Sequence, residues 1–241
     1  MPIAPNFNSI LTKEWDINFL QCYPNGYMKY TELCNILQLT AAAHSEIGGI
    51  SFSDMQEFHQ AWVLSKMRVE IKRLPKWKEV VTVKTWINSL ENSRSTRCLE
   101  VYSGTEKLVG CETYWAVFNT EKRRPEALAL PHEHFEKYEH ERATEQPFSR
   151  INIQNLEDVI SERVVQLSDL DIVNHVNNVK YLEWCLDLVE SEAILLQQIK
   201  AFEMNFMKEL SLLDAIQIVQ KKNIFAITKE GKACFALELE C

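Results

Sequence analysis

The residues best suited to chemistry are concentrated in one short polar segment. Two carboxylates, one histidine and three amides occur within ten positions, namely Asp169, Asp171, Asn174, His175, Asn177 and Asn178. A carboxylate and an imidazole that lie close together can activate water as a general base. The segment precedes a predicted helix, and the free N–H groups at a helix start favour the oxyanion that forms when an ester or thioester carbonyl is attacked. These features predict a hydrolytic site, although the same residue types are common in turns and caps, and Asn178 is expected to cap the helix.

The elements that position this segment are predicted from hydrophobic periodicity. In the second half of the chain we expect a strand over 162–167, a helix over about 178–199, and strands over 201–207, 215–220, 224–228 and 233–239. In the first half we expect a strand over 13–22, a helix over 31–47 with Thr31 as its N-cap, and strands over 61–72, 80–90, 96–103 and 108–119. Each half therefore contains one long helix and a sheet that could wrap it.

The repeated order of elements indicates an internally duplicated fold. The two helix starts share letters, since Lys29-Tyr30-x-Glu32 lies 151 residues before Lys180-Tyr181-x-Glu183. Only the second copy carries the polar set, because the equivalent turn of the first copy, residues 21–27, has no Asp or His. Residues 126–157, which are charged and spaced by prolines, are predicted to form a solvated linker between an N-terminal domain over 1–125 and a C-terminal domain over 158–241.

Composition and charge limit the functions that the chain can have. Hydrophobic residues make up 46% of the 241 positions and charged residues 25%, which is ordinary for a globular protein. The net charge of −8 argues against general nucleic-acid binding, which needs a basic surface. No apolar run approaches the roughly 18 residues of a membrane span, the first 13 residues lack a signal pattern, and the seven cysteines contain no C-x-x-C pair. We therefore expect a cytoplasmic protein with reduced thiols and no metal, membrane or nucleic-acid partner.

Several segments also resemble one known family. Asp169-Leu170-Asp171, followed by His175-Val176-Asn177-Asn178-Val179-Lys180-Tyr181, resembles the active-site signature of acyl-acyl-carrier-protein (acyl-ACP) thioesterases. Residues 61–69 resemble the family's first long strand, residues 74–81 its Pro-x-Trp turn, and residues 115–124 a strand ending in Lys-x-Arg-Arg. The resemblance implies an α+β tandem (double) hotdog fold, in which two long helices are each wrapped by an antiparallel β-sheet. It places the acyl pocket in the N-terminal hotdog and the catalytic residues in the C-terminal one.

The resemblance also implies an activity and residue roles. The reaction is hydrolysis of the thioester that joins a fatty acyl chain to the phosphopantetheine of acyl carrier protein, with no cofactor. Asp171 matches the catalytic Asp as base or nucleophile, His175 matches the catalytic His, and Glu209 matches the acidic residue on the first strand after the second helix. Asn177 and Asn178 match the pair at the helix start.

Two positions depart from the plant members of the family. Val173 stands where they have Asn, and Asn174 follows one residue later. Leu210 stands where they have Cys, which rules out a cysteine nucleophile at that position. We therefore favour activation of water by Asp171, His175 and Glu209, and we include Asn174 and Asn177 among the predicted site residues.

Three alternatives remain open from the sequence. The first is a hotdog thioesterase acting on coenzyme A thioesters, the second a non-catalytic acyl-binding hotdog module, and the third a dehydratase acting on 3-hydroxyacyl groups. Whether the chain forms a homodimer is also left open, because an internal duplication can cover both sheets within one chain.

Two further features are noted for their charge. Residues 66–84 contain seven Lys or Arg against two Glu, and Lys122-Arg123-Arg124 forms a second basic cluster. Because carrier proteins are acidic, both clusters are candidate docking surfaces, and both are equally typical of the solvated face of a sheet.

His44 lies on the apolar face of the first predicted helix, where we expect a packed, hydrogen-bonded histidine.

Overall fold

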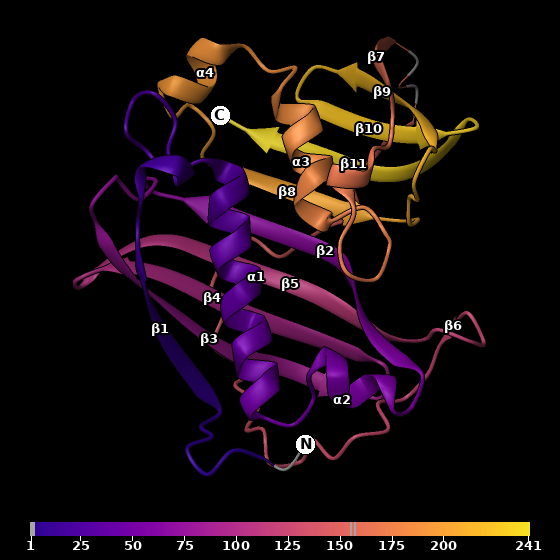
Figure 1. Cartoon of the computed structure of the whole chain (residues 1–241). Coiled ribbons are helices and arrows are strands. Elements are labelled where there is room, and N and C mark those ends of the chain that lie inside the picture. The colour runs from indigo at the N-terminus through magenta and orange to yellow at the C-terminus, as the bar shows by residue number, and fades with distance from the viewer. Residues whose placement is uncertain (1–2, 155, 157) are drawn as a thin grey trace. The chain divides into compact units, whose positions relative to one another are not determined.

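The computed structural model of the chain describes residues 3–154, 156 and 158–241. Met1, Pro2 and positions 155 and 157 of the predicted linker lie outside the described residues. The chain divides into two compact units (Figure 1). The N-terminal unit comprises Met1–Ser65 and Val69–Pro147, and the C-terminal unit comprises Lys66–Arg68 and Phe148–Cys241.

The N-terminal unit is one long helix on an antiparallel sheet. The sheet order is β1-β3-β4-β5-β2, with β6 paired to β5. Its elements are β1 (Ile10–Asp16), η1 (Phe19–Gln21), α1 (Tyr30–Ile47), α2 (Phe52–Gln56), β2 (Gln60–Ile71), β3 (Val80–Glu91), β4 (Arg94–Ser103), β5 (Glu106–Asn119) and β6 (Arg124–Pro125). In Figure 1 α1 runs across the face of these strands, and its buried residues recur every three or four positions as the periodicity predicted. The helix begins at Tyr30 with Lys29 as N-cap, so the prediction of Thr31 as N-cap is wrong.

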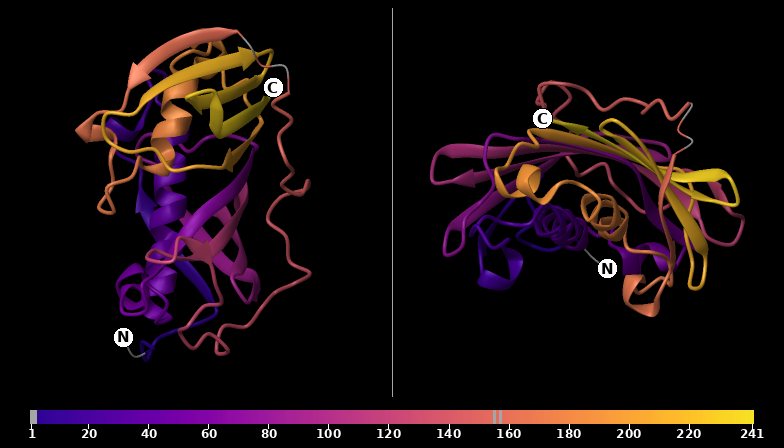
Figure 2. Two further views of the ribbon diagram at one scale, coloured as in Figure 1. Left: turned by 90° about the vertical axis from the view of Figure 1, so that its right-hand side faces the viewer. Right: turned by 90° about the horizontal axis from the view of Figure 1, so that it is seen from above.

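The C-terminal unit repeats this plan with a shorter helix. The sheet order is β8-β11-β10-β9-β7, and its strands curve over α3 (Figure 2). Its elements are β7 (Val159–Val164), η2 (Leu167–Asp169), α3 (Asn178–Leu186), α4 (Ser191–Leu195), β8 (Ala201–Phe206), β9 (Ala215–Lys221), β10 (Ile224–Lys229) and β11 (Lys232–Glu240). The predicted single helix over 178–199 is wrong. The buried stripe is interrupted beyond Leu186, since Leu188, Leu195 and Leu196 are exposed and Ile194 is buried on the separate helix α4.

The internal duplication is visible in matching backbone contacts. Isolated antiparallel bridges join Cys22 to Met28 in the first copy and Leu170 to Val176 in the second. The N-caps Lys29 and Asn177 are likewise 148 residues apart, and each donates its backbone N–H to the last residue of the preceding 3-10 helix. The letter match at a spacing of 151 is therefore three residues out of register with the structural repeat.

The stretch after β6 is packed against the N-terminal sheet. Leu128, Phe135 and Ala143 are buried, so the interpretation of this stretch as solvated is wrong for these positions. Gly110 on β5 permits the close approach, because a Cβ there would lie 2.0 Å from the carbonyl oxygen of Ala143. The domain boundaries at residues 125 and 158 remain a prediction.

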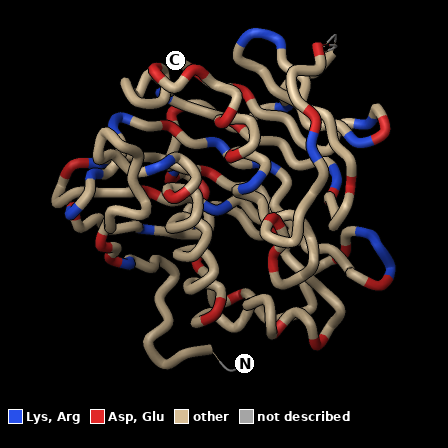
Figure 3. The backbone as a smooth tube through the Cα atoms, turned by 45° about the horizontal axis from the view of Figure 1, so that its top comes forward, with Lys and Arg blue, Asp and Glu red and all other residues tan. Residues whose placement is uncertain are grey.

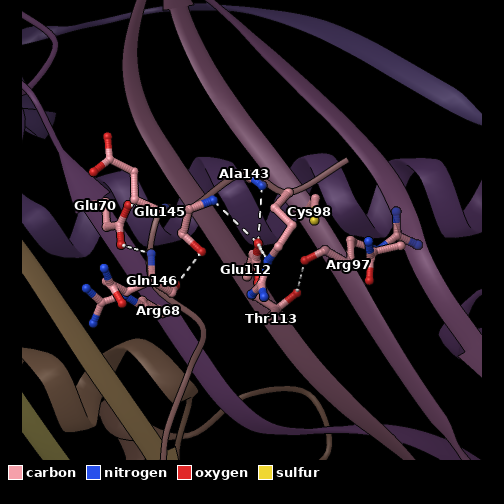
Figure 4. Close-up of polar contacts among 12 residues, drawn as sticks. Arg68, Glu70, Arg97, Cys98, Glu112, Thr113, Ala143, Glu145 and Gln146 are labelled. Atoms are coloured by element: carbon pink, nitrogen blue, oxygen red, sulfur yellow. Dashed lines mark hydrogen bonds and ion pairs between the residues drawn. The ribbon is translucent and has the colours of Figure 1, made fainter. Parts of the chain in front are cut away.

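Buried polar contacts hold the same stretch in place (Figure 4). The Glu112 side chain is 1% exposed, pairs with Arg142, and accepts the backbone N–H groups of Ala143 at 3.2 Å and Thr144 at 3.4 Å. Glu70 accepts the backbone N–H groups of Glu145 and Gln146, at 2.7 and 3.0 Å. Glu112 and Glu70 thus accept hydrogen bonds from the backbone N–H groups of residues 143–146. The charged composition of this stretch does not reveal these partners.

Candidate active site

Four of the five predicted site residues, Asp171, Asn174, His175 and Asn177, lie on a closed loop between η2 and α3. The backbone N–H of Asp171 donates to the carbonyl of His175 at 2.8 Å, and the N–H of Asn174 donates back to the carbonyl of Asp171 at 3.1 Å. Below them, the buried Asp169 carboxylate accepts the N–H of Gln166 at 2.8 Å, and its carbonyl accepts the N–H of Asn177 at 2.9 Å. Asp169 therefore shapes the base of the loop, and Asp171 and His175 are held at its ends.

Asp171 has one oxygen committed to this loop. Its Oδ1 accepts the backbone N–H groups of Val173 at 3.0 Å and His175 at 3.2 Å. The second oxygen, Oδ2, accepts no hydrogen bond from the residues that the structure describes, and the residue is exposed. The carboxylate thus fixes the position of His175 through the backbone and keeps one oxygen open to a water molecule or substrate.

The two asparagines among the predicted site residues have backbone roles. Asn174 adopts φ 64°, a left-handed conformation that Asn tolerates better than most residues, and the equivalent position of the first copy is Gly26 with φ 78°. The Oδ1 of Asn177 accepts the N–H of Val179 at 3.0 Å, so Asn177 is the N-cap of α3. The prediction that Asn178 caps this helix is wrong, because Asn178 is its first residue.

His175 and Glu209 form the one acid–base pair that the sequence predicted and the structure brings together. The Nε2 of His175 lies 3.5 Å from Oε2 of Glu209, with the two side chains 33% and 31% exposed. Glu209 does not lie on a strand, as the resemblance implied, but three residues beyond the end of β8. The carbonyl of Leu210 accepts the N–H of Val176 at 2.9 Å, which ties the residue after Glu209 to the residue after His175.

Tyr181 completes this arrangement, although sequence reasoning assigned it no role. Its buried hydroxyl accepts the backbone N–H of Leu210 at 3.2 Å, so both polar backbone groups of Leu210 are bound. Burial raises the pKa of Tyr181, and the negative charges of Glu209 and Asp171 raise it further, so the phenol stays protonated. The ring packs against Phe206 and Phe235, at centroid distances of 5.7 and 5.2 Å. Tyr181 therefore holds Glu209 in position through the adjacent peptide.

Removing the Tyr181 hydroxyl is expected to lower kcat by more than the accompanying loss of folding stability would explain. Tyr181→Phe leaves the buried N–H of Leu210 without its acceptor, at a cost of about 1–3 kcal/mol. Because the peptide beside Glu209 is then free to shift, we expect kcat for acyl thioester hydrolysis to fall roughly tenfold with KM little changed, since misplaced catalytic groups lose rate steeply.

The control for this prediction is Phe235→Leu, which removes a ring contact of Tyr181 but keeps the hydroxyl. Both variants are compared by steady-state kinetics and thermal unfolding. If Phe235→Leu lowers the unfolding midpoint as much as Tyr181→Phe and lowers kcat equally, the hydroxyl has no positioning role.

The first copy of the loop keeps the backbone and loses the acid–base groups. Tyr23 and Tyr27 occupy the positions of Asp171 and His175, and the N–H of Tyr23 donates to the carbonyl of Tyr27 at 2.8 Å as in the second copy. The N–H of Met28 donates to the carbonyl of Pro75 as Val176 does to Leu210, which makes Leu74 the counterpart of Glu209. Only the C-terminal copy therefore combines a carboxylate and an imidazole at this place.

Within the described residues, no group of three or more His, Cys, Asp or Glu side chains is arranged to hold a metal ion. None of the described helices has both the length and the hydropathy needed to cross a membrane. His44 is fully buried, and its ring nitrogens contact the Asn8 carbonyl at 2.9 Å and Arg97 at 2.8 Å, which confirms a packed, hydrogen-bonded histidine.

Two units, each with a helix wrapped by an antiparallel sheet, define this chain as a double hotdog protein. A solved acyl-ACP thioesterase structure from Bacteroides thetaiotaomicron matches it with a TM-score of 0.86 at 24% identity, covering 96% of this chain and 97% of that one. A putative oleoyl thioesterase structure from Lactobacillus plantarum matches with a TM-score of 0.80 at 19% identity, covering 98% and 97%. These likenesses confirm the predicted fold class.

Sequence comparison identifies the family. The model of the acyl-ACP thioesterase N-terminal domain matches residues 8–138, and that of the C-terminal domain matches residues 154–239. The chain therefore belongs to the acyl-ACP thioesterase family, a family of thioester hydrolases. A chloroplastic oleoyl-acyl carrier protein thioesterase from Coriandrum sativum is 26% identical over 255 residues, covering 91% of this chain and 67% of that protein. The chain spans about half the length of other curated relatives, such as 53% of oleoyl-acyl carrier protein thioesterase 2 from Arabidopsis thaliana.

Proposed function

We propose that this chain hydrolyses fatty acyl-ACP to a free fatty acid and carrier protein. Membership of the acyl-ACP thioesterase family supports the substrate class. The observation that carries the mechanism is the approach of the His175 imidazole to the Glu209 carboxylate, at 3.5 Å, directly before the start of α3. Asp171, His175 and Glu209 are the groups assigned to activate water.

The reaction then follows from the chemistry of these groups. A water molecule beside His175 attacks the thioester carbonyl carbon as the imidazole takes its proton, and Glu209 stabilises the imidazolium that results. The tetrahedral intermediate collapses when its C–S bond breaks, and the proton passes from the imidazolium to the departing thiolate. The positive end of the α3 macrodipole favours the negative charge that develops on the carbonyl oxygen.

The burial of Cys185 and Cys234 in the C-terminal unit supports attack by water. Leu210 is fully buried and both of its polar backbone groups are bound, so its position supplies no nucleophile. Cys185 and Cys234 are buried, and burial raises the pKa of both thiols, which disfavours the thiolate. A carboxylate–imidazole mechanism needs none of these thiols.

Asp171→Asn isolates the charge of Asp171 from its contacts. The amide oxygen of Asn can accept the same N–H groups of Val173 and His175, so the loop is expected to keep its conformation. If the carboxylate takes part in proton transfer, kcat falls by about 10²-fold or more while the unfolding midpoint is retained. Thiol release from acyl-ACP and thermal unfolding measure the two quantities.

Its matched variant is Asp171→Ala, which removes charge and contacts together. If Asp171→Asn is as active as the wild type whereas Asp171→Ala is not, Asp171 only positions the loop. If neither variant changes any property, the non-catalytic acyl-binding alternative is favoured.

The carrier is tested by comparing one acyl chain on two thiols. We expect a higher kcat/KM for the acyl-ACP than for the matching acyl-CoA, measured by thiol release. Equal or better turnover of the CoA thioester would favour the coenzyme A thioesterase, and loss of water from a 3-hydroxyacyl substrate would favour the dehydratase. The cytoplasmic location and the homodimer remain predictions, tested by fractionation and by sedimentation.

A further inference from the structure

We propose that the surface beside the first copy of the catalytic loop, formed by η1 and the turn before β3, is a docking surface for the acidic face of the carrier protein. The surface consists of Phe19, Leu20, Lys76, Trp77 and Lys78, and we call it the lysine–aromatic patch. The inference rests on the proposed function and extends it to a partner-binding surface on the N-terminal unit.

Hydrogen bonds to backbone carbonyls bring the parts of the patch together. The N–H of Trp77 donates to the carbonyl of Gly26 at 2.9 Å, and the N–H of Lys78 donates to the carbonyl of Ile17 at 2.9 Å. The Nζ of Lys29 donates to the carbonyl of Leu20 at 3.1 Å. The 3-10 helix η1, the loop before α1 and the turn before β3 therefore meet at one end of the unit.

The apolar members of the patch are largely exposed. Phe19 is 68% exposed, Leu20 71% and Trp77 51%. Large apolar side chains that project together from a folded unit are typical of an interaction site. Phe19, Leu20 and Trp77 each leave half or more of their surface in solvent, so the burial of a core does not account for their apolar character.

The lysines of the patch carry charge that no carboxylate neutralises. Lys78 places its ammonium 4.7 Å from the Trp77 ring centroid, and Lys76 lies 5.1 Å from the ring centroid of Tyr27. Within the described part of the chain, neither ammonium has a carboxylate oxygen within 4.0 Å. The neighbouring Glu79 pairs with Arg73 at 2.8 Å, and this hydrogen bond lowers the pKa of Glu79 to about 2. The negative charge of Glu79 is therefore balanced by Arg73 and not by the two lysines.

Three of the other cations expected to dock a partner are engaged in ion pairs. Arg68 is buried and pairs with Glu240 at 2.7 Å, and Arg73 pairs with both Glu79 and Glu106. In the second basic cluster, Lys122 pairs with Glu126 at 3.2 Å. The basic segment 66–84 therefore does not act as one surface, and Lys76 and Lys78 are the members of it that flank exposed apolar rings.

Charge complementarity selects an acidic occupant. The chain has a net charge of −8, and acidic and basic residues are interspersed along the backbone in Figure 3, so an acidic protein meets general repulsion. A local pair of unneutralised ammonium groups offsets this repulsion and steers the encounter. The exposed Phe19, Leu20 and Trp77 supply apolar area, and tryptophan is enriched at the energetic centre of interfaces.

Duplication explains why such a surface is available. The first copy retains the backbone of the catalytic loop, but Tyr23, Tyr27 and Leu74 stand where the second copy has Asp171, His175 and Glu209. Because the first copy has no catalytic groups to keep, the segments beside its loop can carry the aromatic and cationic residues of the lysine–aromatic patch. The acyl carrier protein is the acidic macromolecule that the proposed reaction requires.

The test is Lys76→Glu combined with Lys78→Glu. We expect kcat/KM for acyl-ACP at low ionic strength to fall at least about tenfold, mainly through KM, because electrostatic steering contributes factors of about 10–10³. The same acyl chain on N-acetylcysteamine, which has no protein surface to dock, should be hydrolysed as by the wild type. Added salt should lower kcat/KM for acyl-ACP in the wild type and have less effect in the double variant.

The matched control is Lys122→Glu combined with Arg123→Glu, which makes the same charge change at the second basic cluster. We expect it to change kcat/KM for acyl-ACP less than twofold. The proposal is overturned if the control has the same effect, if the double variant impairs both substrates equally, or if it impairs neither. It is also overturned if Trp77→Ala converts a dimer to a monomer in sedimentation, which would make the patch an interface between copies. A wild-type chain that cleaves no acyl-ACP overturns the proposed function instead.

Discussion

His175→Ala is expected to lower kcat for acyl-ACP by about 10²–10⁴-fold, the usual contribution of a positioned general base. The imidazole is one-third exposed and contacts Glu209 through a single 3.5 Å approach, so its loss removes little packing. The backbone N–H and carbonyl of His175, which close the loop with Asp171, are unaffected by the substitution. We therefore expect the unfolding midpoint to stay close to that of the wild type.

Glu209→Gln should lower kcat in the same way, because the amide keeps the shape of the side chain but cannot stabilise an imidazolium. The double variant is expected to be little worse than His175→Ala alone, since groups that act as a unit are not additive. Thiol-release kinetics on acyl-ACP measure all three proteins.

A matched control is Glu183→Gln on α3, which removes a carboxylate that pairs with Lys180 at 2.9 Å at the surface. Activity should be retained there, because exposed ion pairs contribute at most about 1 kcal/mol to stability. Full activity of His175→Ala, or additive losses in the double variant, would show that His175 and Glu209 do not work together.

Strands were predictable from sequence because their signal is local. The alternating Val, Ile, Thr and Trp residues placed β3 at 80–90, and the structure has Val80–Glu91. The same holds for α1, whose buried stripe is continuous. The end of α3 was not predictable, because apolar residues continue beyond Leu186 and only the tertiary packing decides that Leu188 and Leu196 lie outside the core.

Contacts distant in sequence explain the remaining errors. The stretch after β6 is rich in charge, yet Glu112, about 30 residues earlier, satisfies the N–H groups of Ala143 and Thr144. Tyr181 was visible as a letter of the motif, but its role depends on a hydrogen bond to the backbone of Leu210, 29 residues away. Composition identifies the polar groups of a site, whereas their partners are set by the fold.

His44 gives the N-terminal unit a sensitivity to acid that is independent of catalysis. Arg97 donates to its Nδ1, so the proton of the neutral ring is on Nε2 and donates to the Asn8 carbonyl. Burial and, to a smaller extent, the charge of Arg97 together lower the pKa of His44 to about 3. The neighbouring Arg97 remains charged at neutral pH, since burial lowers its pKa only to about 10.

The sign of the effect follows from which state binds the proton. Between pH 6.5 and about 3 the unfolded chain protonates His44 and the folded chain does not, so the free energy of unfolding falls as the pH falls. At about 1.4 kcal/mol per pH unit, acidification from pH 6.5 to 5 should cost roughly 2 kcal/mol. Carboxylates contribute little in this window, because their unfolded pKa values lie near 4.

His44→Asn should remove this pH dependence, since its amide oxygen can accept from Arg97 in place of Nδ1 and does not titrate. The free energy of unfolding, measured with urea, should then differ less between pH 7 and pH 5 for His44→Asn than for the wild type. This holds whatever the stability of the variant at pH 7. The exposed His140 supplies the control, and His140→Gln should keep the wild-type difference. Parallel losses of stability in all three proteins would mean that His44 is not the group responsible, and that the buried contact with Arg97 tolerates a proton.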